Sequence, residues 1–472
     1  MRKEKPTIPV KKNDLVELTI EDFSAAGSGV GHYQGFTIFV PSCAPGDVGS
    51  VKILKVQKNY AFGKLLSLTT ASPGRIDSDC PVDHACGGCC FRHIDYETEL
   101  LYKEKRVRDT LERIGGLDLA ACSFDPITGS AQRNRYRNKC LLPIGRSPCG
   151  TVEMGFYAPH SHRIVDCPDC LLAPLPFAAF IRITRQFLEA HQISIYSEEN
   201  HSGLVRRLYL REAQFTGENM VCLVINGKQL PKADLWVRAL LESGLPITSI
   251  LLNHNTKETN VALGDQTTTL YGSPAIEDRL CGLRFSISPL SFYQVNPPQA
   301  QRLYEKAAEY AALTPSDILL DLYCGTGTIG LSMASRVKAL IGVELIPDAV
   351  ADAQKNARRN GIENARFYCA NASDFQQSHP EIAPSVVIID PPRKGCEPAV
   401  IDCITRYQPR RVVYISCDPA TLARDLRLFA KEKYQPSAVA AYDLFPGTAH
   451  VETCVLLTRE GSCEGHGTAV WD

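Results

Sequence analysis

The sequence lacks the features of a membrane-spanning or exported protein. It contains no run of about 18 apolar residues, the length that a transmembrane helix requires. Its basic start is not followed by the apolar stretch of a secretory signal. Low-complexity segments and repeats of fixed period are also absent. These absences predict a globular cytoplasmic protein with no membrane partner.

The chain also lacks an excess of charge. Its 51 Lys and Arg nearly balance its 52 Asp and Glu. This balance neither favours nor excludes nucleic acid as a partner, because acids elsewhere can offset a basic face. The 19 cysteines are an odd number spread over 472 residues. That distribution argues against a disulfide scaffold and leaves thiols for metal binding or catalysis.

The pattern along the chain predicts three domains and a polar tail. Residues 7–67 alternate apolar and polar side chains between glycines, as in a small five-stranded barrel, which binds nucleic acid or acts as a spacer. Residues 68–285 read as a β-rich central domain, whose helix at 95–115 is a candidate for packing on the next domain. Residues 286–458 alternate strands and helices, as in an α/β domain with a parallel sheet, and 459–472 form the tail.

A glycine-rich turn opens the α/β domain. Gly325, Gly327 and Gly330 give the pattern G-x-G-x-x-G between a strand and a helix, where glycines let the backbone approach a ligand. Glu344 ends the next strand about 20 residues further on and can accept hydrogen bonds from ribose hydroxyls. The pattern predicts a nucleotide site, but it suits a dinucleotide as well as S-adenosylmethionine.

The block DPPRKG, which begins at Asp390, distinguishes the two ligands. Its prolines end a strand at the carboxyl edge of the sheet, where α/β proteins bind their ligands. Hydride transfer has no use for such a block. The motif FYQVN places Gln294 and Asn296 near the same edge. We therefore favour S-adenosylmethionine, with a nicotinamide oxidoreductase as the alternative from another enzyme class.

Cys417 lies between a predicted strand and a helix at this edge of the sheet. Carbon 5 of uracil is too electron-poor to attack a sulfonium methyl group until a thiolate adds to carbon 6 and creates an enolate. A helix N-terminus favours the thiolate, so we predict that Cys417 is a covalent nucleophile. A base must then remove the proton on carbon 5. Glu452 is our choice for that base, and His450 is the alternative.

A compact cysteine loop precedes the predicted helix. Cys80, Cys86 and Cys89 have the spacing C-x5-C-x2-C, and with a fourth thiolate they can bind zinc or an iron–sulfur cluster. Cys167 and Cys170 are the candidates for the fourth ligand.

A basic run follows at 133–139. It interleaves arginines and a lysine with Tyr136 and contains no acid. This composition predicts phosphate contacts and base stacking with RNA.

Several motifs, in this order along the chain, resemble those of the RNA uracil-5-methyltransferase family, and within it the iron–sulfur branch that modifies ribosomal RNA. They are CPVDHACGGC, YRNK, FYQVN, DLYCGTGT, GVE, DPPRKG, SCDPATLARD and HVET. The resemblance covers nearly the whole chain. It implies a Rossmann-like class I methyltransferase domain, an OB-like TRAM barrel at residues 7–67 that binds RNA, and a central RNA-binding domain that carries the cysteine loop.

The resemblance also implies roles for individual residues. Cys417 would be the nucleophile and Glu452 the base in methyl transfer from S-adenosylmethionine to a uridine. The residues that would contact S-adenosylmethionine are Gln294, Tyr323, Glu344 and Asp390, with Asn371 as a weaker candidate for the adenine. The ligands of a [4Fe-4S] cluster would be Cys80, Cys86, Cys89 and, by the family's spacing, Cys170, although Cys167 lies inside the same gap.

The expected substrate is a uridine of 23S ribosomal RNA, with transfer RNA as the alternative, and we expect a monomer. A non-catalytic RNA-binding protein that carries a cluster is the third interpretation.

Overall fold

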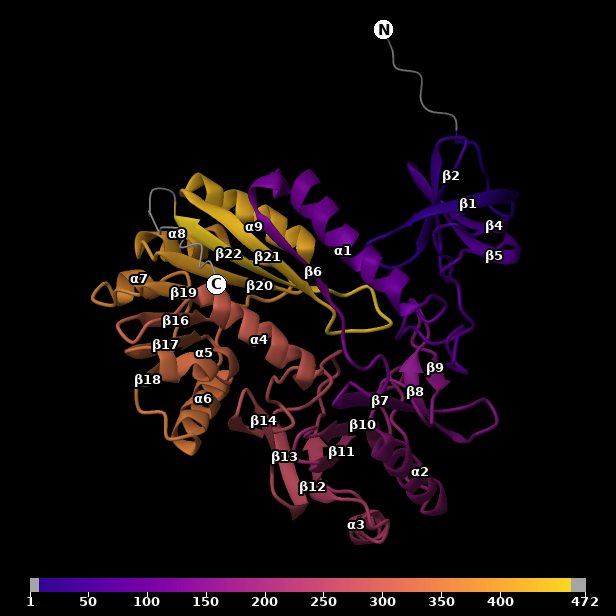
Figure 1. Cartoon of the computed structure of the whole chain (residues 1–472). Coiled ribbons are helices and arrows are strands. Elements are labelled where there is room, and N and C mark those ends of the chain that lie inside the picture. Colours follow the sequence, from indigo (N-terminus) through magenta and orange to yellow (C-terminus); the bar gives the residue numbers. More distant parts are fainter. Residues whose placement is uncertain (1–7, 460–472) are drawn as a thin grey trace, which may run out of the picture.

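The computed structural model describes residues 8–459, and Figure 1 shows them as a small barrel, a central sheet and a larger α/β sheet. Except for its first residue, the predicted polar tail lies outside the described residues. No helix in this range is long and apolar enough to cross a membrane.

The N-terminal barrel is closed by five strands in the order β1-β2-β3-β5-β4, as predicted. Side chains along β1 alternate between solvent and a core that contains Val16, Leu18 and Ile20. Gly49 allows two strands to approach closely, because a Cβ there would lie 2.3 Å from the carbonyl oxygen of Ser67. The strands are β1 (Leu15–Phe23), β2 (Gly29–Tyr33), β3 (Phe36–Val40), β4 (Val48–Val56) and β5 (Tyr60–Thr70).

The central sheet has seven strands in the order β13-β12-β11-β10-β7-β8-β9. Only β11 and β12 pair in parallel. Two helices pack against the sheet through apolar side chains such as Phe177, Phe180 and Trp236. The elements are β7 (Lys139–Arg146), β8 (Val152–Tyr157), β9 (Ile164–Asp166), α2 (Leu175–Ala190), β10 (Val205–Glu212), β11 (Asn219–Ile225), α3 (Ala233–Leu241), β12 (Ile247–His254) and β13 (Gln266–Gly272).

The α/β sheet has eight strands in the order β18-β17-β16-β19-β20-β22-β21-β6. The first five are parallel, and β22 runs antiparallel to β20. Strands such as β19 are buried along their whole length because helices cover both faces. The elements are α4 (Pro297–Ala311), β16 (Ile318–Leu322), α5 (Thr328–Met333), η2 (Ala334–Arg336), β17 (Ala339–Glu344), α6 (Pro347–Arg359), β18 (Ala365–Cys369), α7 (Phe375–Ser378), β19 (Val386–Ile389), α8 (Pro398–Arg406), β20 (Arg411–Ser416), α9 (Pro419–Lys431), β21 (Tyr434–Tyr442) and β22 (Glu452–Arg459).

Segments that precede residue 286 also belong to this α/β unit. Strand β6 (Ser123–Thr128), which follows the turn η1 (Leu119–Ala121), pairs with β21 at the sheet edge. Helix α1 (Tyr96–Arg113) buries Val107 and Leu111 in the core on one side of the sheet. The hairpin of β14 (Ile276–Leu280) and β15 (Leu283–Ile287) contributes to the core on the other side. The packing boundary therefore differs from the predicted sequence boundary at 285.

Helix α1 also connects the α/β unit to the barrel. Phe23 of β1, Phe91 and Tyr102 form a cluster of rings whose centroids lie 4.8 to 5.3 Å apart. The hydroxyl of Tyr102 donates a hydrogen bond to the carbonyl oxygen of Ser24 at 2.6 Å. The barrel is thus held beside α1, at one end of the molecule (Figure 1).

Candidate active site and a cysteine-lined cavity

The sheet brings the predicted nucleophile and base together. Ser416 at the end of β20 pairs with Thr453 in the antiparallel strand β22. Cys417 and Glu452 are therefore the next residues on these two strands, at the same edge. Asp390 follows β19, the parallel neighbour of β20, and reaches this edge as well. Residues far apart in the sequence thus meet where α/β sheets bind their ligands.

The acidic groups at this edge disfavour a further negative charge. Burial raises the pKa of Glu452 to about 8, with Asp390 raising it further and Arg393 lowering it. Burial also raises the pKa of Asp390 to about 7. The pKa of Cys417 is raised to about 11, first by burial and then by the nearby Glu452 and Asp390. The thiol is therefore not activated by the protein alone.

The activation of Cys417 by the following helix stays a prediction, because the N-terminus of this helix is already capped by a side chain. The carboxylate of Asp418 caps α9 and accepts hydrogen bonds from the backbone N–H groups of Ala420 at 3.0 Å and Thr421 at 2.8 Å. These amides are the donors that would otherwise stabilise a thiolate. The positive charge that faces Cys417 in the protein is that of Arg393, which lowers the pKa of the thiol.

His450 lies near the same edge, but its chemistry differs from that of Glu452. Burial is the largest of the effects that lower its pKa to about 4, and Arg393 is the next. Its Nε2 lies 3.3 Å from Nη2 of Arg393, which can only donate, so Nε2 accepts. A neutral imidazole that is already hydrogen-bonded is a weak base, and this favours Glu452.

The glycine-rich turn has a left-handed backbone at several positions. Gly325 and Gly327 have φ values of 54° and 82°, and Tyr323 also lies in the left-handed region with φ 63°. Gly330 donates its backbone N–H to Oδ2 of Asp321 at 2.9 Å, and a Cβ at Gly330 would lie 2.6 Å from that oxygen. Strain at a non-glycine residue such as Tyr323 is characteristic of functional turns.

Glu344 stabilises this turn through its carboxylate. Its carboxylate accepts hydrogen bonds from the N–H groups of Gly325 at 3.1 Å and Ile346 at 2.9 Å. The next side chains, Leu345 and Ile346, are 63% and 55% exposed. Adjacent exposed apolar residues are typical of a surface that a ligand covers. Asn371, which follows β18, is exposed and accepts a hydrogen bond from its own turn.

Gln294 is held at the site by the central domain. Asn138 donates its side-chain amide to the backbone oxygen of Gln294 at 2.9 Å. The Gln294 side chain hydrogen-bonds with Tyr304, whose pKa is raised by burial and by the charge of Asp390. The neighbouring Asn296 instead caps α4, so it supports the fold.

Two residues of this site received no role from the sequence. Arg393 faces Cys417, Glu452 and His450, and its place within DPPRKG was the available signal. Tyr304 lies in the middle of α4, where an aromatic residue looks like ordinary core, and no local pattern would have identified it.

A separate cavity of about 290 Å³ is lined by cysteines and by three basic side chains, Arg92, Arg137 and Lys139. The cysteines on its wall are Cys80, Cys86, Cys89, Cys140, Cys167 and Cys170. Cys167 and Cys170 are hydrogen-bonded to each other, so both candidates for the fourth ligand face the loop. Among residues 8–459, no cysteine forms a disulfide and no three His, Cys, Asp or Glu side chains are placed to hold a single metal ion.

The predicted RNA contacts of the basic run 133–139 need correction. Tyr136 is 1% exposed and donates its hydroxyl to the carbonyl oxygen of Pro446, so it cannot stack on a base. Arg133 bonds to backbone carbonyls, and Arg135 forms a salt bridge with Asp169. Most of these side chains therefore bond to other parts of the protein, because buried polar groups need hydrogen-bond partners.

The barrel has an exposed face that combines aromatic rings with lysines, the combination that we expected to bind RNA in the basic run. Phe39, Tyr60 and Phe62 lie on adjacent strands with ring centroids 5.5 to 5.9 Å apart. By strand register, Lys55 lies opposite Phe62, and Lys52 lies opposite Lys64. The segment from 48 to 70 contains no Asp or Glu. None of its lysines forms a salt bridge with another described residue.

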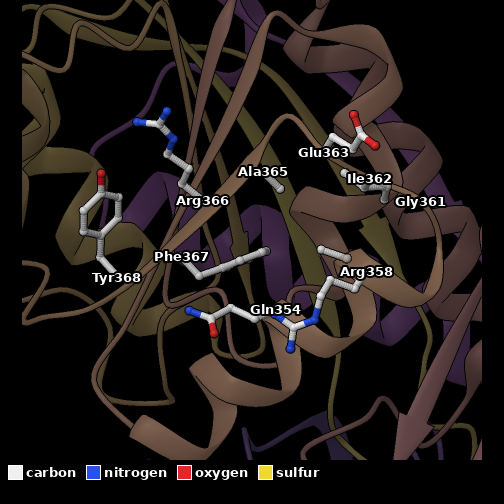
Figure 2. Close-up of a pocket in the computed structure, with 10 residues that line it drawn as sticks. Gln354, Arg358, Gly361, Ile362, Glu363, Ala365, Arg366, Phe367 and Tyr368 are labelled. Atoms are coloured by element: carbon white, nitrogen blue, oxygen red, sulfur yellow. The ribbon is translucent and has the colours of Figure 1, made fainter.

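A shallow pocket of about 720 Å³ lies at the outer edge of the α/β sheet, between α6 and β18. Figure 2 shows Gln354 and Arg358 reaching it from α6 and Phe367 from β18. None of the predicted site residues lines it, so we assign it no catalytic role.

The sequence matches two known protein families and is similar to known proteins over nearly its whole length. Residues 269–460 match the family tRNA (uracil-5-)-methyltransferase, and residues 9–66 match the TRAM domain. An uncharacterised RNA methyltransferase of Halalkalibacterium halodurans is 41% identical over 458 residues, which are 96% of this chain and 99% of that protein. The chain belongs to the uracil-5-methyltransferase family of RNA methyltransferases. Another uncharacterised RNA methyltransferase, from Clostridium tetani, is 40% identical over 97% of this chain and 99% of its own length.

A solved member of this family has the same architecture. The tRNA (uracil-54, C5)-methyltransferase of Pyrococcus abyssi, in complex with S-adenosyl-L-homocysteine, is 28% identical with a TM-score of 0.75, and the match covers 94% of this chain and 99% of that chain. The likeness confirms the predicted fold class, a TRAM barrel with a class I methyltransferase domain. Family membership also decides between the enzyme classes: the protein is an RNA methyltransferase and not a nicotinamide oxidoreductase.

Proposed function

We propose that this methyltransferase transfers a methyl group from S-adenosylmethionine to carbon 5 of a uridine, with Cys417 as nucleophile and Glu452 as base. The observation that carries the proposal is the adjacency of these side chains at the ends of β20 and β22, beside Asp390. A thiol and a carboxyl group at one sheet edge are what addition and proton removal require.

The proposed steps balance in atoms and electrons. Cys417, as its thiolate, adds to carbon 6 of uracil, and the electrons of the 5,6 double bond form an enolate. Carbon 5 takes the methyl group from the sulfonium, which leaves as S-adenosylhomocysteine. Glu452 removes the proton from carbon 5. The electrons of that C–H bond restore the double bond and expel the Cys417 thiolate, releasing 5-methyluridine.

The proposed S-adenosylmethionine site follows the carboxyl ends of β16, β17 and β19. Glu344 would bind ribose hydroxyls, and the exposed Leu345 and Ile346 would cover the adenine. Tyr323, Gln294 and Asp390 would contact the rest of the molecule. A sulfonium cation here would add positive charge to that of Arg393, and it would lower the pKa values of Cys417 and the carboxyl groups.

We assign RNA binding in part to the barrel face of Phe39, Tyr60 and Phe62. Aromatic rings stack on unpaired bases, and unpaired lysines attract phosphates. The double variant Tyr60→Ala/Phe62→Ala should lower RNA affinity by about 5- to 100-fold, since one stacked base contributes about 1–3 kcal/mol. Leu15→Ala, which changes an exposed apolar residue elsewhere on the barrel, is the control. Unchanged RNA affinity in the double variant would move the contact to another surface.

The residues around the cysteine cavity fit an iron–sulfur cluster better than a zinc ion. A single zinc ion needs four ligands within about 2.3 Å of one point, an arrangement that is absent from residues 8–459. A cluster with its own sulfides holds cysteines farther apart, around a space such as this cavity of about 290 Å³. The three basic side chains on the wall would balance its thiolates. We propose Cys80, Cys86, Cys89 and Cys170 as ligands of a [4Fe-4S] cluster.

Iron and sulfide analysis of anaerobically purified protein tests this proposal. Cys86→Ser and Cys170→Ser should lose iron, whereas Cys149→Ser, at an exposed cysteine outside the cavity, should keep it. A full iron content in Cys170→Ser together with loss in Cys167→Ser would transfer the fourth position to Cys167. Stoichiometric zinc without iron would refute the cluster.

The proposed substrate is 23S ribosomal RNA, supported by the resemblance of the cysteine loop to that of the ribosomal branch. The Pyrococcus abyssi protein acts on transfer RNA, which remains the alternative. Mass spectrometry of both RNAs from cells without the protein tests this choice. Loss of 5-methyluridine from 23S RNA supports the proposal, and loss from transfer RNA alone selects the alternative. Methylation of a cytidine or of a nitrogen by purified protein would contradict the proposed chemistry.

A further inference from the structure

A fully buried group of charges lies next to the active-site edge. Lys103 of α1 forms salt bridges of 2.7 Å with both Glu99 and Asp443, and all three side chains are 0% exposed. Buried ion pairs contribute little to stability compared with apolar residues of similar size, because desolvation offsets their attraction. The role of these three residues is therefore better inferred from where they lie than from their contribution to stability.

These charges hold the loop that connects β21 to β22. Lys103 donates to the carbonyl oxygen of Phe445 at 3.2 Å, and the N–H of Gly447 donates to Glu99 at 2.7 Å. Asp443 accepts the N–H of Phe445 at 3.0 Å. Figure 1 shows this loop beside α1. Two bonds from the helix and one within the loop therefore fix the loop backbone.

The cysteine loop and the next turn of α1 hold the same segment. The N–H groups of Cys90 and Phe91 both donate to the carbonyl oxygen of Gly447, at 2.9 and 3.1 Å. Arg106 donates to the carbonyl oxygen of Ala449 at 2.5 Å. The chain then continues directly into His450 and Glu452.

We propose that Lys103, Glu99 and Asp443 are positioning residues that hold the loop 443–449 so that Glu452 faces carbon 5 of the bound uridine. Because their side chains are fully buried, they can act only through the loop. The inference rests on the proposed roles of Cys417 and Glu452. Because the contacts are specific to the loop before Glu452, the step that they support is proton removal and not RNA binding.

The double variant Lys103→Met/Asp443→Asn tests this role. It removes one charge of each sign and leaves Glu99 with Arg133, 3.6 Å away. We expect kcat to fall at least tenfold, KM for RNA and affinity for S-adenosylmethionine to stay within twofold, and a covalent adduct between Cys417 and methylated RNA to accumulate on denaturing gels. The matched control is Lys105→Met, an exposed lysine on the same helix.

Arg106→Gln is a second variant that removes no fully buried charge, and we expect the same pattern with a smaller loss of kcat. If thermal melting shows that the double variant does not fold, Arg106→Gln becomes the test of the positioning role. Unchanged kcat in a folded variant, or a loss of kcat with no adduct, would overturn the positioning role. Turnover by Cys417→Ala would instead refute the proposed function, whatever the loop variants show.

Discussion

The cysteine that we propose for catalysis and those that we propose for the cluster differ in the charges around them. Cys417 lies beside Glu452 and Asp390, which raise its pKa, and Arg393, which lowers it. The cysteine cavity has three basic side chains and one acidic side chain, Asp83, on its wall. Nearby negative charge opposes a thiolate and nearby positive charge favours it. Each surrounding therefore suits a partner of the opposite charge: a sulfonium cation beside Cys417 and an anionic cluster in the cavity.

Removing Cys417 should have the largest effect on turnover. Cys417→Ala cannot form the enolate, so 5-methyluridine formation should fall by more than about 10⁴-fold. Iron content and RNA binding should stay unchanged, because the cavity is a separate site. Cys149→Ala is the control. Residual turnover near the wild-type level, measured with labelled S-adenosylmethionine, would remove Cys417 from the reaction.

Replacing the base should slow a later step. Glu452→Gln should turn over about 10²- to 10⁴-fold more slowly, the usual contribution of a general base. Methyl transfer would still occur, so a covalent protein–RNA adduct should accumulate on denaturing gels. The exposed Glu432 at the end of α9 provides the control Glu432→Gln. Full turnover in Glu452→Gln would assign the base role to His450 or another group.

The charge around Cys417 can be tested through pH. Both reacting groups must lose a proton, so turnover should rise with pH. The part of the rise that is due to Glu452 should lie below its pKa of about 8, because the bound sulfonium lowers that pKa. The pKa of Cys417, about 11 without ligand, should fall when S-adenosylmethionine binds, by about one unit or more. The uncharged S-adenosylhomocysteine should lower it less. Rates of thiol alkylation against pH, with each ligand, measure this difference; equal pKa values would contradict the charge argument.

The smallest effect should come from the basic wall of the cavity. Lys139 has no salt bridge to any other described residue, and burial is the first cause that lowers its pKa to about 8. Near pH 7, Lys139→Met therefore removes most of one positive charge from the wall. We expect faster loss of iron to a chelator and a more negative reduction potential, because an anionic cluster loses a compensating charge. Lys228→Met, outside the cavity, is the control. An unchanged potential and unchanged iron loss would show that this charge does not act on the cluster.

Sequence patterns were reliable where the chemistry depends on neighbours in the chain. The predicted glycine-rich turn lies between β16 and α5, with a left-handed backbone at Gly325 and Gly327, and DPPRKG ends β19 at the carboxyl edge of the sheet. The same reasoning failed for the run 133–139. Its composition matches an RNA-binding surface, but Tyr136 is buried against Pro446, more than 300 positions away.

The sequence by itself determined the family, the barrel, the order of strands and helices in the α/β domain, and the residue types available for catalysis, because these follow from local periodicity and contiguous motifs. Only the tertiary structure decided which of these residues meet. The antiparallel register of β20 and β22 places Cys417 beside Glu452, and Lys103 reaches the loop before Glu452 from a helix in another part of the sequence. Burial and pairing depend on surfaces contributed by distant segments, and no local pattern records which segment covers which surface.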